Sequence, residues 1–257
     1  MPVLLTERDG PVLRLTLNRP EVRNAIDDEV IAALTAAGRS AADDPELRAV
    51  VLAGHGKTFC AGADLAWMSK AIGYTREENR RDAEDLARML ETLNTLPVPL
   101  IARVHGAALG GGAGLIAVCD IVVAADDATF GFSEVKLGII PSVISPYVID
   151  KIGVSAARAL FLTGVRFSAR RARRLGLVHD VVANGELDET IDAHLKEVFT
   201  AGPQAIAAAK ALIREVSGSR TADVIGLTTS RIAEQRVSDE GQEGMRAFLE
   251  KRKANWE

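Results

Sequence analysis

The chain has 257 residues, of which 47% are hydrophobic and 4% aromatic, so it can bury the core of one large domain and is too apolar for disorder. Its net charge of −4 comes from interspersed acids and bases, which excludes the basic stripe that nucleic-acid binding requires. The cysteines and histidines lack disulfide-framework or metal-site spacing, and no apolar run approaches membrane-spanning length, so we expect a cytoplasmic protein without metal, membrane or nucleic-acid partner.

The first half of the chain predicts strands that alternate with helices. Residues 12–17 alternate at period two and stop at a turn, as a half-buried strand does. Acids at 27–29 favour a helix start, and residues 47–54 predict a short buried strand. An amphipathic helix is expected over 80–96, followed by a strand from Leu100. This alternation of strands and helices indicates an α/β fold of repeated β–β–α turns.

From about Asp188 onward the pattern changes to helices alone. The spacing predicts helices over 205–215, 222–237 and 241–253, with no further strand. We therefore expect a core of residues 1–190 and a helical C-terminal subdomain of residues 191–257.

Two segments rich in small residues would leave backbone N–H groups open to a ligand. They are residues 59–64 and the glycine run 108–114, and each follows an apolar stretch. Gly111 stands at an expected helix start, where an N–H points outward, and Ala63 could supply a second donor. Two such donors suit the oxygen of a thioester enolate. Glu134 then follows as a candidate proton-transfer group.

Other interpretations of these residues stay open at this point. A strand, a glycine-rich turn and a helix are also the layout of a dinucleotide-binding fold, but Leu115 stands at the sixth position of the G-x-G-x-x-G pattern. The glycines could also serve only to pack a helix closely on a strand. By spacing alone, Glu134 fits a surface charge or a helix cap equally well.

Segments along nearly the whole chain resemble the enoyl-CoA hydratase/isomerase (crotonase) family. The resemblance lies in residues 61–65, 106–112, 119–121, 130–141, 175–178 and 243–253. It implies that residues 1–190 form a spiral of β–β–α units with the coenzyme A and catalytic site. It also implies that residues 191–257 form a helical oligomerisation subdomain that assembles trimers, or hexamers built from two trimers. It also implies an acyl-CoA thioester substrate, no separate cofactor because coenzyme A is part of that substrate, and an oxyanion hole formed by the N–H groups of Ala63 and Gly111.

The resemblance also implies which residues contact or shape the coenzyme A site. In the core these are Arg23, Ala61, Asp64, Leu65 and Gly110. Phe248 and Lys251, which match the family's C-terminal helix, would reach the coenzyme A of a neighbouring subunit. Ala66 stands where the family often has a lysine, so the resemblance does not extend to that phosphate contact.

The chain departs from the family's hydratases at one catalytic position. Those enzymes carry two glutamates that together hold the attacking water; Glu134 matches the second, and Gly114 stands where the first belongs. A single carboxylate can move a proton between two carbons without bound water, as a double-bond isomerase does. It can also activate water alone, or share that task with an unrecognised group.

The amino-acid sequence of residues 62–68, 112–115 and 133–149 resembles that of bacterial hydratases of 3-methylglutaconyl-CoA and related branched enoyl-CoA thioesters. In that branch a stretch from Ser142 to Tyr147 replaces the usual proline- and glycine-rich segment, which indicates a changed acyl pocket. We therefore expect a hydro-lyase that adds water to a short or branched 2-enoyl-CoA, with Glu134 as acid and base. The alternatives are a Δ3,Δ2-enoyl-CoA isomerase and a non-catalytic acyl-CoA-binding protein.

Overall fold

The computed structural model describes residues 1–256, and its centre is a six-stranded sheet in the order β1-β2-β3-β4-β6-β9. The strands are β1 (Leu4–Asp9), β2 (Val12–Leu17), β3 (Ala49–Gly54), β4 (Leu100–Val104), β6 (Ile121–Ala125) and β9 (Asp180–Val182). Only β1 and β2 pair antiparallel in this sheet, among the residues described. A smaller sheet joins β5 (Ala107–Leu109), β7 (Thr129–Gly131) and β8 (Arg166–Ser168).

Helices connect and cover these sheets. They are α1 (Asp28–Ala42), α2 (Leu65–Ala71), α3 (Arg76–Asn94), α4 (Gly111–Ala117), α5 (Ser145–Thr163), α6 (Ala169–Arg174), α7 (Leu187–Thr200), α8 (Pro203–Val216), α9 (Thr221–Val237) and α10 (Asp239–Glu250), with short 3-10 helices η1 (Pro20–Val22), η2 (Glu134–Leu137) and η3 (Asn184–Glu186). Helix α1 packs on α3, α4 packs on α5, and α7 lies against β4 and β6. Within the described chain, no helix is both long and apolar enough to cross a membrane.

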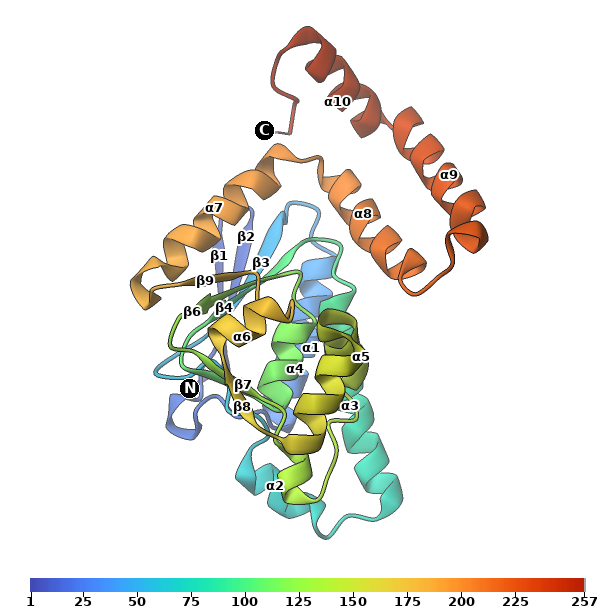
Figure 1. The fold of residues 1–257 in the computed structure, drawn as a ribbon. Coiled ribbons are helices and arrows are strands. Elements are labelled where there is room, and N and C mark those ends of the chain that lie inside the picture. The colour runs from blue at the N-terminus through green and yellow to red at the C-terminus, as the bar shows by residue number, and fades with distance from the viewer. Residues whose placement is uncertain (257) are drawn as a thin grey trace.

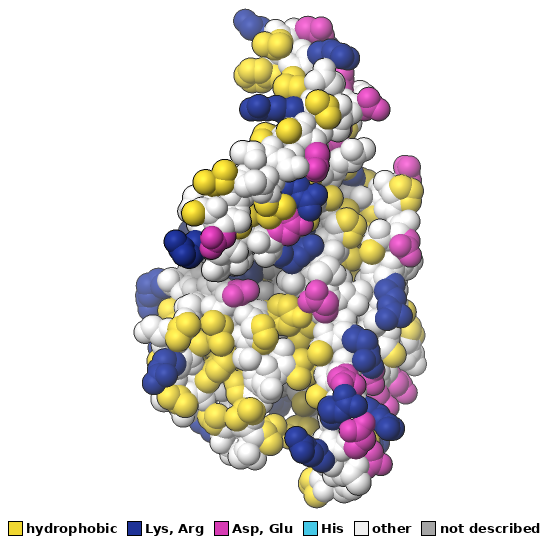
Figure 2. All heavy atoms as spheres, turned by 90° about the vertical axis from the view of Figure 1, so that its right-hand side faces the viewer, with side chains coloured by type: hydrophobic (Ala, Val, Ile, Leu, Met, Phe, Trp, Pro, Cys, Tyr) yellow, Lys and Arg dark blue, Asp and Glu magenta, His cyan; other side chains and the backbone are white. Residues whose placement is uncertain are grey.

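The last helices form an arm that extends away from the sheet. Helices α9 and α10 lie at the far end of the molecule from α2 and the lower end of α3 (Figure 1). Hydrophobic side chains show on the surface of this arm and over the lower body, beside a column of mixed acids and bases (Figure 2). Helix α7 runs through residue 190 without a break, and the division of the chain at that residue stays a prediction.

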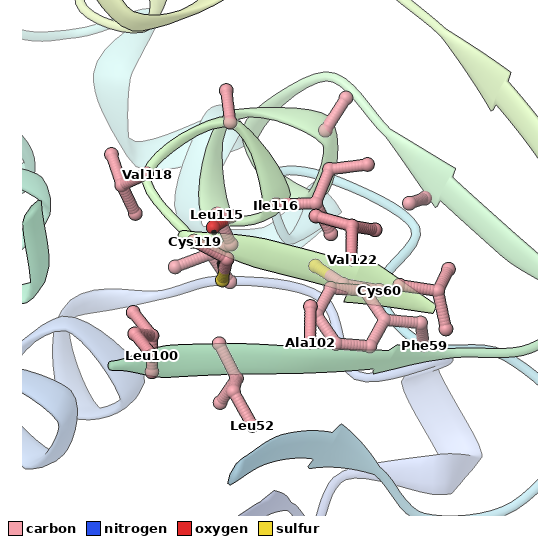
Figure 3. Close-up of a cluster of buried hydrophobic side chains, with 14 of the residues drawn as sticks. Leu52, Phe59, Cys60, Leu100, Ala102, Leu115, Ile116, Val118, Cys119 and Val122 are labelled. Carbon is pink, nitrogen blue, oxygen red and sulfur yellow. Dashed lines mark hydrogen bonds between the residues drawn. The ribbon is translucent and has the colours of Figure 1, made fainter. Parts of the chain in front are cut away.

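The core lies between the parallel strands and α4. Leu52, Leu100, Ala102 and Val122 from the sheet pack with Phe59, Cys60, Leu115, Ile116, Val118 and Cys119 (Figure 3). Both cysteines are free, and burial raises the pKa of each thiol to about 12, so both stay protonated at neutral pH.

The structure confirms the α/β class and the helical C-terminal region. The strands expected from Val12 and Leu100 have the predicted bounds, and Asp27 caps α1 as its acids indicate. The helix expected from residue 80 begins earlier, at Arg76, because Thr75 and Glu78 form a capping box. Strand β1 escaped prediction because it is an edge strand with exposed polar residues, and β5, β7 and β8 because they have three residues each.

Candidate active site

The structure brings the two small-residue segments side by side. Cys60 and Ala108 form a parallel bridge, with Cys60 N–H donating to Ala107 O at 3.0 Å and Leu109 N–H donating to Cys60 O at 3.1 Å. A β-carbon on Gly62 would lie 3.0 Å from Leu109 O and 3.9 Å from Gly110 Cα. Gly62 also has a φ of 102°, in the region that favours glycine. Glycine therefore permits this close approach of two backbone segments.

Each segment leaves one N–H directed away from its neighbours. Ile26 bridges to Ala63 by donating to Gly62 O at 2.7 Å and accepting from Asp64 N–H at 2.8 Å, so the N–H of Ala63 itself faces away from Ile26. Gly111 is the first residue of α4, where an N–H has no acceptor within the helix, and no side chain caps this end. Both residues line the same cavity.

Glu134 begins η2 on the wall beside these donors. A β-carbon on Gly110 would lie 3.2 Å from Glu134 Oε1, so the carboxylate would have to shift, and the φ of 48° at Gly110 also favours glycine. The other oxygen, Oε2, is buried without a hydrogen-bond partner among the described residues. Burial raises the pKa of this carboxyl group, and a hydrogen bond from its own backbone N–H acts weakly against that shift. A carboxylate that has one unpartnered oxygen and a raised pKa suits proton transfer.

The position of Gly114 is filled by a hydrocarbon side chain. A β-carbon at residue 114 would overlap Ile144 Cγ2 and lie 3.0 Å from Ile144 Cβ. Ile144 comes just before α5, which packs on α4, and is 3% exposed. The chain therefore has an apolar contact at the position where the resemblance implies the first glutamate of the hydratases.

The cavity has a volume of about 440 Å³ and a mostly apolar lining. Helices α2 and α3 contribute Trp67, Met68, Ala71, Asp82, Ala83 and Leu86. The opposite wall consists of Leu137, Ile139, Ile140, Pro141, Ser142, Val143 and Ile144. The cavity can accept a short or branched hydrocarbon chain beside a polar end made of backbone N–H groups and one glutamate.

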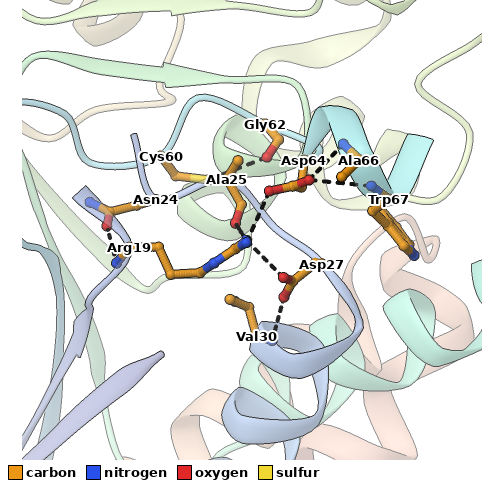
Figure 4. A network of polar contacts seen from close by, with 10 residues as sticks. All are labelled: Arg19, Asn24, Ala25, Asp27, Val30, Cys60, Gly62, Asp64, Ala66 and Trp67. Atoms are coloured by element: carbon orange, nitrogen blue, oxygen red, sulfur yellow. Dashed lines mark hydrogen bonds and ion pairs between the residues drawn. The ribbon is translucent and has the colours of Figure 1, made fainter. Parts of the chain in front are cut away.

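A polar network supports the loop that carries Ala63 (Figure 4). Asp64 caps α2 by accepting from Ala66 N–H and Trp67 N–H at 2.8 and 3.2 Å, and Arg19 pairs with both Asp64 and Asp27 at 3.0 and 2.9 Å. Burial acts to raise the pKa of Asp64, but the N–H donors and Arg19 together outweigh it and hold that pKa below its usual value. The network ties the loop to the start of α1.

The structure gathers most of the predicted site residues around the cavity. Those that line it are Ala61, Ala63, Leu65, Gly110, Gly111 and Glu134. Asp64 is buried behind the loop, and Arg23 is exposed but accepts from Ala61 N–H through its backbone carbonyl at 3.0 Å. Phe248 and Lys251 lie at the end of α10, in the arm, so a single chain does not bring them to its own cavity (Figure 1).

Sequence analysis missed four residues that shape the site: Arg19, Trp67, Asp82 and Ile144. Arg19 pairs with Asp64, Trp67 with Asp82, and Ile144 packs on Gly114. These partners are distant in the sequence, so no local sequence pattern predicts the contacts. The three hydroxyl groups of the stretch from Ser142 to Tyr147 have different surroundings. Ser142 lines the cavity, Ser145 Oγ donates to Ser142 O at 2.7 Å, and Tyr147 Oη donates to Glu91 at 3.0 Å.

Comparisons with known proteins agree with this fold. The sequence model of the enoyl-CoA hydratase/isomerase family matches residues 7–257. An enoyl-CoA hydratase from Shewanella pealeana has a crystal structure that matches with a TM-score of 0.96 and 39% identity, over 99% of this chain and 96% of that chain. The 2,3-dehydroadipyl-CoA hydratase of Escherichia coli is 35% identical over 98% of this chain and 97% of its own length. The crotonyl-CoA hydratase of Syntrophomonas wolfei is 31% identical, over 98% and 97%.

These matches place the protein in a class of α/β enzymes with the crotonase fold. The chain belongs to the enoyl-CoA hydratase/isomerase family.

Proposed function

We propose that the protein adds water to a short or branched 2-enoyl-CoA through a thioester enolate, with Glu134 as the only acid–base group beside the reacting carbons. The observation that carries this proposal is the buried, unpartnered Oε2 of Glu134 in the cavity that Ala63 and Gly111 also line. A carboxylate oxygen without an internal partner is available to hold and deprotonate water.

In the proposed mechanism the thioester carbonyl accepts hydrogen bonds from Ala63 N–H and Gly111 N–H. Water held by Glu134 adds to C3 while Glu134 takes its proton, and the electrons of the double bond move onto the thioester oxygen. The two N–H groups stabilise that charge, and removal of one donor from such a site costs roughly a hundredfold in rate. Glu134 then returns a proton to C2, which completes the addition.

Ile144 explains why one glutamate carries the whole task. Because its side chain occupies the space beside Gly114, no side chain of α4 can reach the water from that position. The raised pKa of Glu134 helps a single group to act first as base and then as acid, since both steps are efficient when the pKa approaches the working pH.

The proposed binding site for the coenzyme A part of the substrate rests on the family resemblance. The coenzyme A moiety would lie against Arg23, Ala61, Asp64, Leu65 and Gly110. Phe248 and Lys251 of a neighbouring subunit would complete its site in a trimer or in a hexamer of two trimers. Two relatives are named as hydratases of crotonyl-CoA and of 2,3-dehydroadipyl-CoA. The local sequence resemblance adds 3-methylglutaconyl-CoA as a branched candidate substrate.

Hydration of crotonyl-CoA tests the proposal directly, through the loss of absorbance of the conjugated thioester. We expect turnover by the wild-type protein and a fall of roughly a thousandfold or more in kcat for Glu134→Gln, which keeps the size of the side chain but cannot take a proton. Asp127→Asn, which neutralises an exposed acid outside the cavity, serves as the matched control. Absence of turnover with every conjugated enoyl-CoA offered would refute the proposal.

The filled position at Gly114 also favours a second candidate, the Δ3,Δ2-enoyl-CoA isomerase. That reaction needs one carboxylate to carry a proton from C2 to C4 and no bound water. With 3-hexenoyl-CoA, an isomerase would produce the conjugated thioester, and its absorbance would rise. A high rate of this rise without any subsequent hydration would replace the first candidate by the second.

A further inference from the structure

The lining of the cavity contains an acid that the proposed mechanism does not use. Asp82, from the first half of α3, lines the cavity together with Trp67, Ala83 and Leu86. Asp82 and Glu134 are the acids of the lining, and the described residues that form it include no Lys, Arg or His. The charge that this cavity presents to an acyl group is therefore negative.

Trp67 fixes the position of this carboxylate. The indole Nε1–H of Trp67, on α2, donates to Asp82 Oδ1 at 3.0 Å, and both side chains are partly buried. The bond joins α2 to α3 across the cavity wall, and Asp82 Oδ2 takes no part in it. The carboxylate is thus held at the wall rather than turned freely into solvent.

The surroundings of Asp82 add no positive charge. Burial raises the pKa of Asp82, the Trp67 hydrogen bond opposes that shift, and Asp85 and Asp28 add to it. Three of the four arginines of α3 pair with other acids: Arg80 with Glu77 and Glu84, Arg81 with Glu77, and Arg88 with Asp85. The fourth, Arg76, is the first residue of the helix and does not line the cavity. Among the described residues, an anionic group in the cavity beside Asp82 would therefore meet no cation of the lining.

We propose that Asp82 is a specificity residue that selects acyl groups with a neutral end and disfavours those that end in a carboxylate. This inference rests on the proposed function, because it concerns the acyl group of the same enoyl-CoA substrate. Two like charges about 8 Å apart in a partly buried site change a binding constant by roughly ten- to thirtyfold. The proposal separates the candidate substrates, since 3-methylglutaconyl-CoA and 2,3-dehydroadipyl-CoA both end in a carboxylate whereas crotonyl-CoA does not.

Two matched pairs of substrates isolate the terminal charge. Hex-2-enoyl-CoA and 2,3-dehydroadipyl-CoA have the same chain length and differ in a terminal methyl or carboxylate, as do 3-methylpent-2-enoyl-CoA and 3-methylglutaconyl-CoA. The measurement is the ratio of kcat/KM for the carboxylate member to that for the neutral member, at pH 8, where carboxylates are ionised. We expect a wild-type ratio of about 0.1 or lower for both pairs.

Asp82→Asn retains an oxygen acceptor for Trp67 and removes the charge. We expect it to raise the ratio about tenfold or more, whereas Asp85→Asn, an exposed acid one turn further along α3, changes the ratio by less than about threefold. A wild-type ratio near one that Asp82→Asn leaves unchanged would overturn the proposal, and so would an equal loss with both members, which would place Asp82 in the chemistry. Failure of wild-type protein to hydrate either member would instead refute the proposed function.

Discussion

At the scale of single residues, the burial of Glu134 and its proposed catalytic role favour opposite protonation states. Burial without a partner disfavours its charged form, yet the proposed chemistry requires that form to hold and deprotonate water. Active sites often keep such a group at the expense of stability. Gly110 and Gly114 belong to the same arrangement, because the first leaves room for the carboxylate and the second for Ile144.

The raised pKa of Glu134 predicts the acid limb of the pH profile. The group must be ionised to act as base, so kcat/KM for crotonyl-CoA falls as the pH drops through its pKa, and the midpoint lies above the ordinary value of 4.5. Steady-state assays between pH 4 and 9 measure this limb. An acid midpoint at or below the ordinary glutamate value would contradict the role of burial.

The same shift predicts a stability effect of defined sign. A carboxyl group whose pKa is higher in the folded state destabilises the fold when it is ionised, and the penalty disappears as the pH falls through the folded and then the unfolded pKa. Glu134→Gln should therefore raise Tm at pH 7.5 by roughly 2 °C and leave it unchanged near pH 4. Calorimetry at the two pH values checks this, and a lower Tm for the variant at pH 7.5 would be inconsistent with a buried, unpaired charge.

Gly114 and Ile144 predict a coupled effect on stability. Helix propensity alone would make Gly114→Ala stabilising by about 1 kcal/mol, but the overlap with Ile144 should make it destabilising by about 1–3 kcal/mol. Ile144→Ala opens space, so the double variant should lose less than the sum of the two single losses. Urea unfolding measures all three. Gly226→Ala, where a β-carbon meets no atom within 4 Å, is the control and should not be destabilising.

At the scale of elements, α2 links the oxyanion loop to the acyl pocket. Its N-terminus is capped by Asp64, next to Ala63, and its Trp67 holds Asp82 of α3. A short helix of this kind depends on its cap and its packing because it has too few residues to be stable alone. Changes at Asp64 should therefore reach the substrate site as well as the fold.

Substitution of Asp64 separates the cap from the ion pair. Asp64→Ala removes both and should cost about 1–2 kcal/mol of stability and raise KM for crotonyl-CoA more than it lowers kcat. Asp64→Asn keeps a capping oxygen and loses only the charge that pairs with Arg19, so its effect should be smaller. Urea unfolding and steady-state kinetics measure both variants. Equal losses for the two would mean that the cap contributes nothing.

Elements with strong local signals could be predicted, and contacts between elements could not. The alternation of β2 and the acids before α1 specify those elements within the sequence itself, and Gly111 marks a helix start that the structure has at that residue. The hydrogen bond from Trp67 to Asp82 and the packing of Ile144 on Gly114 join residues from different elements. Such contacts depend on how α2, α3, α4 and α5 are arranged in space, which no single segment encodes.

At the scale of the whole molecule, the arm is joined to the body by Arg48. Its guanidinium donates to Ala201 O at 2.7 Å and to Trp256 O at 3.2 Å, so one side chain at the start of β3 holds both ends of the C-terminal region. The arm also exposes large apolar side chains, including Ile225, Ile232, Val237, Met245, Phe248 and Leu249. Apolar surface of this extent is typical of protein interfaces, which agrees with the proposed homo-oligomer.

Charge placed on this surface should prevent assembly. We expect the wild-type chain to have the mass of a trimer or hexamer of 27.4 kDa subunits, and the double variant Phe248→Glu/Leu249→Glu to dissociate into smaller species. Light scattering after gel filtration measures the mass. Leu5→Glu, which alters an exposed apolar residue of β1 instead, is the control. A monomeric wild-type protein would contradict the proposed assembly.

The most direct test of the central claim is the fate of a solvent oxygen atom. Crotonyl-CoA incubated with the wild-type protein in ¹⁸O-labelled water should give 3-hydroxybutyryl-CoA that carries one label at C3, and Glu134→Gln should form this product at least a thousandfold more slowly. Mass spectrometry of the acyl group reads the result. Unlabelled acyl groups after prolonged incubation, or equal labelling rates for wild type and Glu134→Gln, would contradict a hydratase that works through Glu134.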